Sequence, residues 1–571
     1  MKYIVISHAY KGWALVVLAS LVVIMSACLG NNQTAQSTPT PTIPVILYSP
    51  ITLGLPKDVL TNEKNAGPIS DATPMTVTLF FKLNTTQQQQ LQKALKASSQ
   101  STIGLDPKIV RNIQTFFGVS NVSLQVDKEQ TYGSFSAPAK TVGKLFRTSF
   151  AWFTYKNQRF YAPITPPQLP SLMVPYITSV QGLDSYQQPI QTGVVVEKKL
   201  GTNPHADCSP SQGVFPQQIA KAYGFDQFAN NNFAGQNMTV VLAEIDTFNS
   251  ADIQNYAACV NYTGKIRTVN VDTPPTQVEG ESTLDLEMIM SLAPKINIVD
   301  YQTGAGTKGL LDEITQISQL SMSPGSVVSI SIGGPEEGMT RAFLDAFNQR
   351  LTVIDSHHES VFIASGDCAA FTDQVFGSKS VSFPASSPYA ISVGGTQLQT
   401  DAQGNRLSEM TWSDPNPDTS SCQNAWGSGG GTSNYFPQPS YQQVSGPSVG
   451  ALSSSLGFRN VPDVAAIADN LPVYVNGQWE LVGGTSAATP IWATGMALID
   501  QALIAKKGLY YYGPGLLYYA GQIQAGSSRG PFFDIVQGTN FAYNAGPGWD
   551  YTSGFGTPNL VSLYQVLLAV K

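Results

Sequence analysis

Apolar, strand-like runs alternate with helical segments from about Cys208 onward, and this alternation limits the fold more than any other feature. The runs are Met238–Ile245, Ile296–Tyr301, Ser326–Ile332, Val361–Ser365 and Ala390–Val393. Buried strands that are separated by helices form a mostly parallel sheet with helices on both faces. The predicted fold class for residues 208–571 is therefore α/β, and a site is expected in the loops at the carboxyl edge of the sheet.

Residues 1–74 have the composition of an export signal followed by a tether. Lys2 and Lys11 precede an apolar run from Gly12 to Met25, which is followed by the small residues Ser26 and Ala27 and then by Cys28. This order is typical of a signal peptide over residues 1–28. The ending Met-Ser-Ala-Cys is similar to a bacterial lipoprotein signal and predicts a lipid on Cys28. A plain signal peptide and an uncleaved anchor are the alternatives. Residues 29–74 are rich in Thr and Pro and are predicted to be a tether.

Residues 75–187 have the pattern of a separate small domain. A strand-like alternation from Met75 is followed by helices over about 86–98 and 106–117, an extended segment, a helix over about 138–149 and a strand over 159–163. This order, β-α-α-β-α-β, predicts an α+β sandwich. The polar residues 188–207 are predicted to be a linker.

The composition excludes one class of partner and suits an acidic medium. Charged residues make up 12% of the chain, about half the usual share. The net charge of −7 provides no basic surface for nucleic acid. Few carboxylates also limit the charge that builds up when they protonate, which suits a protein that stays folded in acid.

Four cysteines follow Cys28, and an even number in an exported chain predicts two disulfides. Three pairings exist, and our hypothesis joins Cys208 to Cys259 and Cys368 to Cys422. No pair has CxxC spacing, and with four histidines in all a zinc site is not expected.

The stretch Gly483-Gly484-Thr485-Ser486-Ala487-Ala488-Thr489-Pro490 contains the candidate nucleophile. Its glycines allow the backbone to approach a substrate closely. Ser486 is expected at a helix N-terminus, where free N–H groups and the dipole favour negative charge, with Pro490 in the first turn. A serine in such a turn is often only a helix cap, so its partners decide the interpretation.

No histidine is suitably placed to activate Ser486. His8 lies in the signal and His205 in the linker, while His357 and His358 lie in a polar segment that is expected to be solvated. The base must therefore come from another residue type.

Carboxylates provide that base. Glu281 and Asp285 are four residues apart at the start of an apolar helical run, so both project from one helix face. Two like charges at this spacing are unfavourable, and a shared proton resolves the conflict. An acidic first turn that complements the helix dipole is the structural alternative. Asp367 follows the apolar strand VFIAS, where it would cap the next helix or, if protonated, donate a hydrogen bond to an oxyanion.

Seven motifs in this order resemble the sedolisin family of serine-carboxyl peptidases, close to its kumamolisin branch: GESTLD, SISIGG, ASGD, FPASSP, SGGGTSNYFPQPSYQ, RNVPDVAA and GGTSAATPIWA. The resemblance covers about residues 208–571. Residues 75–187 resemble the family's activation propeptide, notably in RFYAPITPPQLP and VQGLD. The resemblance implies a subtilisin-like, mostly parallel sheet flanked by helices, preceded by a small ferredoxin-like α+β propeptide domain.

The resemblance also implies a role for each candidate residue. Ser486 would be the nucleophile, Glu281 its general base and Asp285 the group that orients Glu281, while Asp367 would line the oxyanion hole. Glu244 matches a supporting glutamate, whose tryptophan partner in the kumamolisin branch is replaced here by Ile332.

The C-terminal part contains a candidate calcium site. Carboxylates and backbone carbonyls in glycine turns suit calcium, a hard cation. The resemblance implies one ion, held by side-chain oxygens of Asp534 and Asp550 and by carbonyls of Ile535, Gly546 and Gly548.

Together, the residues and the resemblance predict an acid-active endopeptidase that is secreted or anchored at the cell surface. It would be made as a zymogen that cuts itself within the linker. The alternatives are a tripeptidyl-peptidase of the same family and a catalytically inactive surface binding protein. Expected partners are protein or peptide substrates and the propeptide, an intramolecular inhibitor. Membrane contact is expected only through the N-terminal anchor, and the chain is expected to be a monomer.

Overall fold

The computed structural model describes residues 46–55, 59, 63–91, 103–187, 191–192, 195–201, 212–371, 378–415, 422, 425–444, 447–454, 457–523 and 530–570. The predicted signal, Cys28, most of the tether, His205 and Cys208 lie outside these residues. Within the described part, no helix combines the length and the apolar character that crossing a membrane requires.

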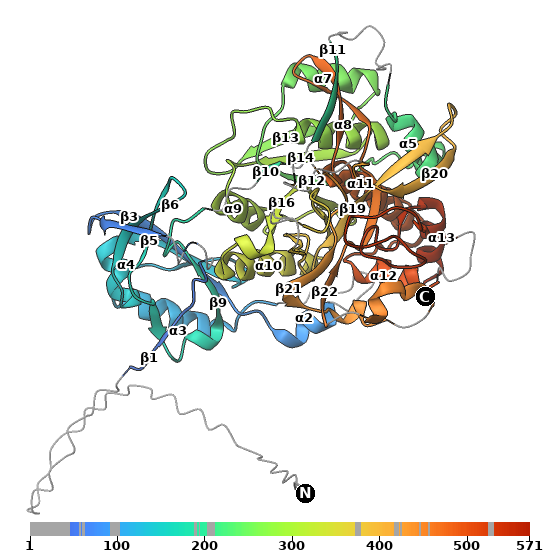
Figure 1. The fold of residues 1–571 in the computed structure, drawn as a ribbon. Helices are drawn as coiled ribbons and strands as arrows, with labels where there is room; N and C mark the ends of the chain where they lie inside the picture. The colour runs from blue at the N-terminus through green and yellow to red at the C-terminus, as the bar shows by residue number, and fades with distance from the viewer. Residues whose placement is uncertain are drawn as a thin grey trace, which may run out of the picture. The chain divides into compact units, whose positions relative to one another are not determined.

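A largely parallel sheet forms the centre of the C-terminal domain (Figure 1). Its strand order is β13-β14-β12-β15-β17-β19-β20. Neighbouring strands are parallel throughout, except that β20 pairs antiparallel with β19. The strands are β12 (Thr239–Glu244), β13 (Ile266–Asn270), β14 (Asn297–Gln302), β15 (Val327–Ile330), β17 (Ser360–Ala364), β19 (Ile391–Thr400) and β20 (Arg406–Thr411), and β23 (Val464–Ile467) also pairs with β19. The predicted α/β class is confirmed.

The side chains of β12 alternate between two hydrophobic cores. Val240 and Leu242 join one core, and Val241 and Ala243 join the other. Because successive side chains of a strand point to opposite faces, the two cores lie on the two faces of the sheet. The first core contains side chains of α8 (Glu281–Leu292) and α11 (Thr485–Lys507), and the second contains those of α9 (Thr307–Ile317) and α10 (Arg341–Ser356).

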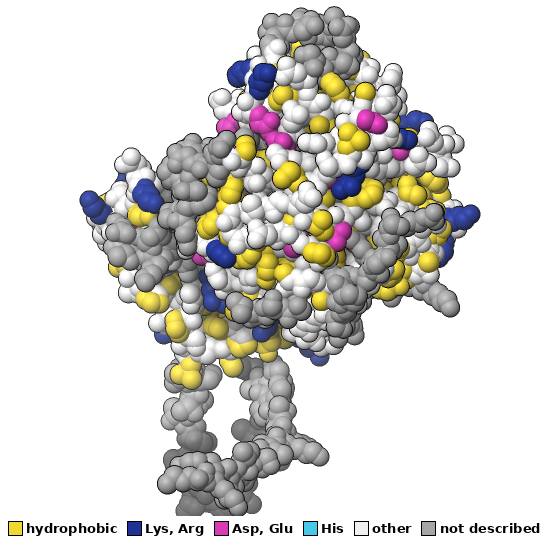
Figure 2. Space-filling model, turned by 45° about the vertical axis from the view of Figure 1, so that its right-hand side comes forward, with side chains coloured by type: hydrophobic (Ala, Val, Ile, Leu, Met, Phe, Trp, Pro, Cys, Tyr) yellow, Lys and Arg dark blue, Asp and Glu magenta, His cyan; other side chains and the backbone are white. Residues whose placement is uncertain are grey.

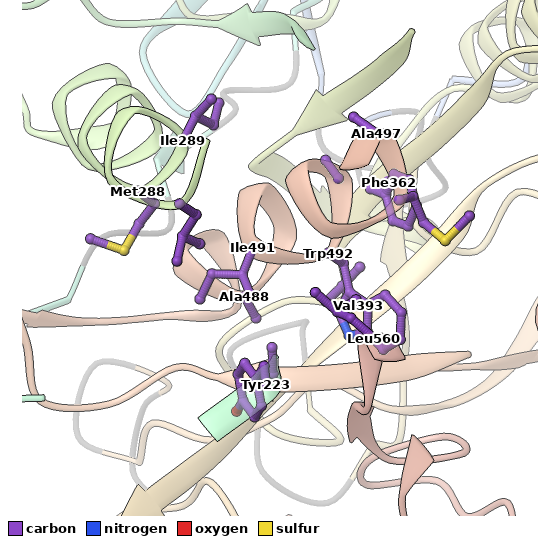
Figure 3. Packing of buried hydrophobic residues seen from close by; sticks show 14 of the residues in the cluster. Tyr223, Met288, Ile289, Phe362, Val393, Ala488, Ile491, Trp492, Ala497 and Leu560 are labelled. Atoms are coloured by element: carbon purple, nitrogen blue, oxygen red, sulfur yellow. The ribbon is translucent and has the colours of Figure 1, made fainter. Parts of the chain in front are cut away.

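Helices α8 and α11 pack against each other on one face of the sheet. Figure 3 shows Met288 and Ile289 of α8 beside Ala488, Ile491 and Trp492 of α11. This contact is the part of the fold that matters most for function, because the predicted carboxylates lie on α8 and the predicted nucleophile on α11.

The N-terminal domain has an antiparallel sheet of order β4-β5-β3-β9. Its elements are β3 (Pro74–Phe81), α3 (Pro107–Gly118), β4 (Gln125–Val126), β5 (Tyr132–Pro138), α4 (Ala139–Phe146) and β9 (Ile177–Gln181). Strand β3 lies between the last strand and the third, which is the ferredoxin-like arrangement. Phe117 of α3 and Phe146 of α4 pack on Val77 and Leu79 of β3 in one core.

Two segments are more structured than the sequence predicted. The tether was expected to reach residue 74, yet β1 (Tyr48–Pro50) pairs with β8 (Gln168–Pro170) and β2 (Lys64–Pro68) pairs with β6 (Phe150–Tyr155). Such short edge strands require backbone hydrogen bonds and few buried side chains, so their polar composition did not indicate them. The tether prediction is wrong for these strands.

The segment predicted as a linker also contributes strands. Strand β10 (Gln191–Thr192) pairs antiparallel with β16 (Ile332–Pro335), and β11 (Val195–Gly201) pairs antiparallel with β25 (Gln478–Gly483). The described part of the linker is therefore paired with the C-terminal domain rather than free.

The remaining elements complete both domains. They are α2 (Thr85–Leu91), β7 (Gln158–Pro163), α5 (Pro216–Tyr223), α6 (Phe225–Asn230), α7 (Ser250–Cys259), β18 (Ser382–Phe383), β21 (Gly431–Pro437), β22 (Phe458–Val461), β24 (Leu471–Val475), α12 (Gly515–Ile523), β26 (Phe532–Phe533), β27 (Thr557–Pro558) and α13 (Leu560–Ala569). On the face shown in Figure 2, charged side chains are sparse and scattered.

Candidate active site

Ser486 lies at the start of α11, directly after strand β25. Gly484 is the N-cap, at φ 133°, a value that favours glycine. The Ser486 side chain is fully buried, and its hydroxyl donates to the carbonyl oxygen of Ser331 at 3.0 Å. Ser486 therefore lies at a helix N-terminus, as the sequence predicted.

The sequence analysis placed Pro490 in the first turn of the helix, and this prediction is wrong. Pro490 lies inside α11, which begins at Thr485. A proline has no N–H, so it cannot donate to the carbonyl oxygen of Ser486 four residues earlier. The hydroxyl of Ser331 lies 3.2 Å from that oxygen and donates to it. Ser331 therefore contacts Ser486 through both its carbonyl and its hydroxyl group.

Ser331 also connects the nucleophile to Asp285. Its hydroxyl lies 2.8 Å from Oδ2 of Asp285. A hydroxyl has one proton, so it can donate fully to only one of the two oxygens unless the bond is bifurcated, and a protonated Asp285 can donate to the Ser331 oxygen instead. The sequence analysis did not identify Ser331, which is 46 residues from Asp285 and 155 from Ser486.

A cluster of buried carboxyl groups surrounds Asp285. Glu244, Glu281 and Asp285 are all fully buried. Burial, followed by the negative charges of Asp285 and Glu281, raises the pKa of Glu244 well above its usual value. Burial also raises the pKa of Asp285, an effect that its hydrogen bond with Ser331 opposes. Glu244 and Asp285 therefore keep protons that isolated carboxyl groups would lose at the same pH.

Asp367 contacts the N-terminus of α11 next to Ser486. Its Oδ1 accepts hydrogen bonds from the backbone N–H of Thr485 at 2.6 Å and from the Thr485 hydroxyl at 2.8 Å. Burial raises the pKa of Asp367 to about 6, although the two hydrogen bonds from Thr485 oppose this shift. Because Oδ1 accepts twice, a proton on this carboxyl group belongs on Oδ2, where it can be donated.

The described histidines lie outside this site. Nε2 of His357 contacts both carboxylate oxygens of Glu129 at 3.0 Å. His358 was expected to be solvated, but it is buried and its ring packs on Tyr512.

Glu287 is another carboxyl group on α8. It accepts a hydrogen bond from the backbone N–H of Tyr474 at 3.0 Å.

The cysteines occupy two places in the fold. Cys368 and Cys422 form a disulfide with a Cα–Cα distance of 4.9 Å, directly after Asp367 in the chain. Cys259 is disulfide-bonded, and its hypothetical partner Cys208 lies outside the described residues.

Asp534 and Asp550 lie close to each other near the C-terminus. Oδ2 of Asp534 accepts the N–H of Gly548, and Oδ2 of Asp550 accepts the N–H of Gly546, both at 2.9 Å. Oδ1 of Asp534 is buried without a hydrogen-bond partner. Burial raises the pKa of both carboxyl groups. A buried carboxylate oxygen without a donor beside a second carboxylate fits a cation, although the described residues contain no cluster of three or more His, Cys, Asp or Glu that could hold a metal.

Comparisons with known proteins find matches over both domains of the chain. The Subtilase family model matches residues 277–507, and the model of the pro-kumamolisin activation domain matches residues 84–186. Kumamolisin of Bacillus sp. (strain MN-32) is 29% identical over 454 residues, covering 76% of this chain and 78% of the relative. Sedolisin of Pseudomonas sp. (strain 101) is 26% identical over 470 residues, covering 77% of this chain and 76% of the relative.

Two further comparisons concern a tripeptidyl-peptidase and a solved structure. Tripeptidyl-peptidase 1 of Homo sapiens is 30% identical over 311 residues, covering 50% of this chain and 52% of the relative. The structure of Pseudomonas sedolisin in complex with two molecules of pseudo-iodotyrostatin has a TM-score of 0.54 at 23% identity, covering 63% of this chain and 99% of that one.

The fold and the buried serine define a serine-type peptidase with a subtilisin-like domain. The chain belongs to the sedolisin family of serine-carboxyl peptidases and carries the activation domain of that family at its N-terminal side. The activation domain implies an intramolecular inhibitor and protein substrates.

Proposed function

We propose that this chain is an acid-active endopeptidase made as a self-processing zymogen, with Ser486, Glu281, Asp285 and Asp367 as its catalytic residues. One observation carries the proposal. A buried serine at a helix N-terminus is connected through Ser331 to a cluster of buried carboxyl groups, while both described histidines make contacts elsewhere.

The mechanism assigns one proton transfer to Glu281. Ionised Glu281 accepts the hydroxyl proton of Ser486 as the Ser486 oxygen attacks the scissile carbonyl carbon. Protonated Asp367 donates a hydrogen bond from Oδ2 to the oxyanion. The C–N bond then breaks, the leaving amine takes the proton from Glu281, and an acyl-enzyme remains. Water hydrolyses this ester by the same steps, and Ser486 regains its proton. Since the Ser486 hydroxyl donates to the Ser331 carbonyl in this structure, it must change that bond before it reacts.

The same groups support an acidic working range. The mechanism requires a protonated Asp367, and the pKa of this group is raised to about 6. A raised folded-state pKa stabilises the fold fully below the unfolded value, and this contribution is lost as the pH rises through the folded value. Burial raises the pKa of Asp300 and of Asp355 to about 8, so both also favour the folded state in acid.

Glu244 belongs to the cluster of buried carboxyl groups, but the tryptophan that would donate a hydrogen bond to it in the kumamolisin branch is absent. Ile332 occupies the position of the expected tryptophan and is buried in the second hydrophobic core. An isoleucine side chain cannot donate a hydrogen bond. We therefore assign Glu244 a hydrogen bond with Asp285, which lowers the pKa of Asp285, and no proton relay beyond it.

The activation domain is held by helix α10. Nε2 of Gln349 donates to the carbonyl oxygens of Phe81 and Thr131, both at 2.7 Å. The hydrogen bond with His357 lowers the pKa of Glu129. A depressed carboxyl pKa favours the docked state at higher pH, and this contribution is lost as the pH falls through the folded value. Acid therefore weakens this contact and favours release.

We expect acid processing between Thr192 and Val195. Thr192 pairs with Ile332 of the SISIGG segment, and Val195 pairs with Gly483, three residues before Ser486. The described residues at both ends of this interval therefore pair with residues close to Ser331 and Ser486 in the chain. Purified full-length chain should stay intact at pH 7 and shorten at about pH 4, and mass spectrometry should find the new N-terminus in this interval. An unchanged length after acidification would contradict self-processing.

Product analysis separates the alternative activities. An endopeptidase releases internal fragments of varied length from a denatured protein, whereas a tripeptidyl-peptidase releases tripeptides from the N-terminus. The similarity to tripeptidyl-peptidase 1 makes this test necessary. Absence of any hydrolysis at about pH 4 would favour the inactive binding protein.

We further propose one calcium ion, held by Asp534 and Asp550 together with carbonyls of Ile535, Gly546 and Gly548. The buried, partnerless Oδ1 of Asp534 supports it. The ion would stabilise the fold by neutralising two adjacent carboxylates. Removing calcium with EGTA should lower the melting temperature by about 5 °C, as a ligand at 100 times its Kd contributes about 2.7 kcal/mol. Asp534→Asn should abolish this dependence, and equal melting temperatures with and without calcium would contradict the site.

The localisation is proposed from the sequence alone. A signal over residues 1–28, with a lipid on Cys28, would place a monomeric peptidase outside the cell or on its surface. Mass spectrometry of the N-terminal peptide from the exported protein tests the lipid.

A further inference from the structure

Asp246 was not singled out by the sequence, and it lies two residues beyond the end of β12. Its side chain is 1% exposed. Oδ2 accepts the backbone N–H groups of Glu279 at 3.0 Å, Gly280 at 2.9 Å and Glu281 at 3.2 Å. Oδ1 accepts the N–H of Ser282 at 2.9 Å and its hydroxyl at 2.7 Å. One carboxylate thus binds the whole N-terminal turn of α8.

Helix α8 has no cap of its own. Its N-cap is Gly280, at φ 108°, which makes no side-chain hydrogen bond to the helix. The first N–H groups of a helix need acceptors, and a negative charge there also interacts favourably with the helix dipole. Asp246 supplies both from the segment that follows β12, 34 residues before Gly280 in the sequence.

We propose that Asp246 is a positioning residue of the peptidase, which fixes the backbone of Glu281 and sets the charge around the carboxyl cluster. The inference rests on the proposed function, because it concerns the base of that reaction. Asp246 accepts the backbone N–H of Glu281 directly and so fixes the backbone position from which the side chain of the base extends. A displacement of about 1 Å of a catalytic group lowers a rate by about 100-fold.

The charge of Asp246 acts on the groups packed around it. It raises the pKa of three described carboxyl groups: those of Glu244 on β12, Asp285 on α8 and Asp300 on β14. Burial raises the pKa of Asp246 itself, while its hydrogen bonds with Ser282 oppose this. Asp367 is shifted by burial and by Thr485, without a contribution from Asp246.

These relations predict an asymmetric change in the pH profile. In Asp246→Asn the isosteric amide removes the charge and places an NH₂ group against backbone donors. We expect kcat to fall about 10- to 100-fold with KM little changed. The acid limb, which reports ionisation of the carboxyl cluster, should move to lower pH by about one unit. The alkaline limb, which reports the loss of the proton from Asp367, should stay at the same pH.

Two variants make the result decisive. Ser282→Ala removes one hydroxyl donor but keeps the carboxylate, so it should fold even if Asp246→Asn does not, and its acid limb should move in the same direction by less. Asp252→Asn is the control: Asp252 is a buried carboxylate on α7 that accepts the N–H of Gly477, and its substitution should move neither limb.

The measurement is kcat and KM from pH 2.5 to 7 on an internally quenched peptide, with acid-treated full-length protein. A lower rate with an unmoved acid limb in Asp246→Asn and Ser282→Ala would overturn the inference and leave only a structural role. Because each variant is compared with an active wild type, this failure is distinct from that of the proposed function, in which the wild type itself would be inactive.

Discussion

Ser486→Ala is expected to abolish both self-processing and hydrolysis of added substrate. The alanine keeps the helix and its packing but removes the oxygen that would form the acyl-enzyme. Loss of an activated nucleophile lowers kcat by about 10⁴-fold or more. The precursor should therefore stay at full length at about pH 4, while wild type shortens. Gel electrophoresis after acidification and a quenched-peptide assay measure the two effects.

A pair of substitutions on α8 tests which carboxylate is the base. Glu281→Gln should lower kcat about as strongly as Ser486→Ala, and the double variant should be no worse than either one, because the two groups act as a unit. Glu287→Gln is the matched control, since Glu287 is equally buried on the same helix but accepts the N–H of Tyr474. Equal losses in Glu281→Gln and Glu287→Gln would contradict the assignment and indicate a general effect on the helix.

The central sheet could be predicted because its strands are buried on both faces. The five predicted runs contain or overlap β12, β14, β15, β17 and β19, where most residues are buried. Strand β13 was missed, since it lies at the edge and exposes Arg267, Thr268 and Asn270. An edge strand has no continuous apolar run that a sequence pattern can detect.

The candidate nucleophile and carboxylates were identified because their motifs are local. Glu281 and Asp285 share one helix face, and Ser486 follows two glycines. Asp246 and Ser331 had no such signal, because their partners are 33 or more residues away in the sequence. Nothing in the neighbourhood of an aspartate after a strand reveals that the fold will place a helix N-terminus against it. His358 illustrates the reverse, since a polar neighbourhood suggested exposure and Tyr512 covers it.

The largest expected loss of stability follows from Asp463→Asn. Asp463 and Arg459 form an ion pair in which both side chains are fully buried, with N–O distances of 2.7 and 2.6 Å. Burial alone would lower the pKa of Arg459, but the charge of Asp463 outweighs it and the pKa is raised. Asp463 also accepts hydrogen bonds from the backbone N–H of Ser392 and the hydroxyl of Tyr518.

Neutralising only one partner leaves the guanidinium group buried without a counter-charge. We expect Asp463→Asn to lower the free energy of unfolding of the peptidase domain by about 3–5 kcal/mol. Urea unfolding followed by tryptophan fluorescence measures this, in the Ser486→Ala background to prevent self-digestion. The double variant Arg459→Met, Asp463→Leu removes both charges and should be less destabilised than Asp463→Asn, because an apolar pair carries no desolvation penalty. If Asp463→Asn unfolds at the same urea concentration as its parent, the buried pair does not stabilise the strands around the active site.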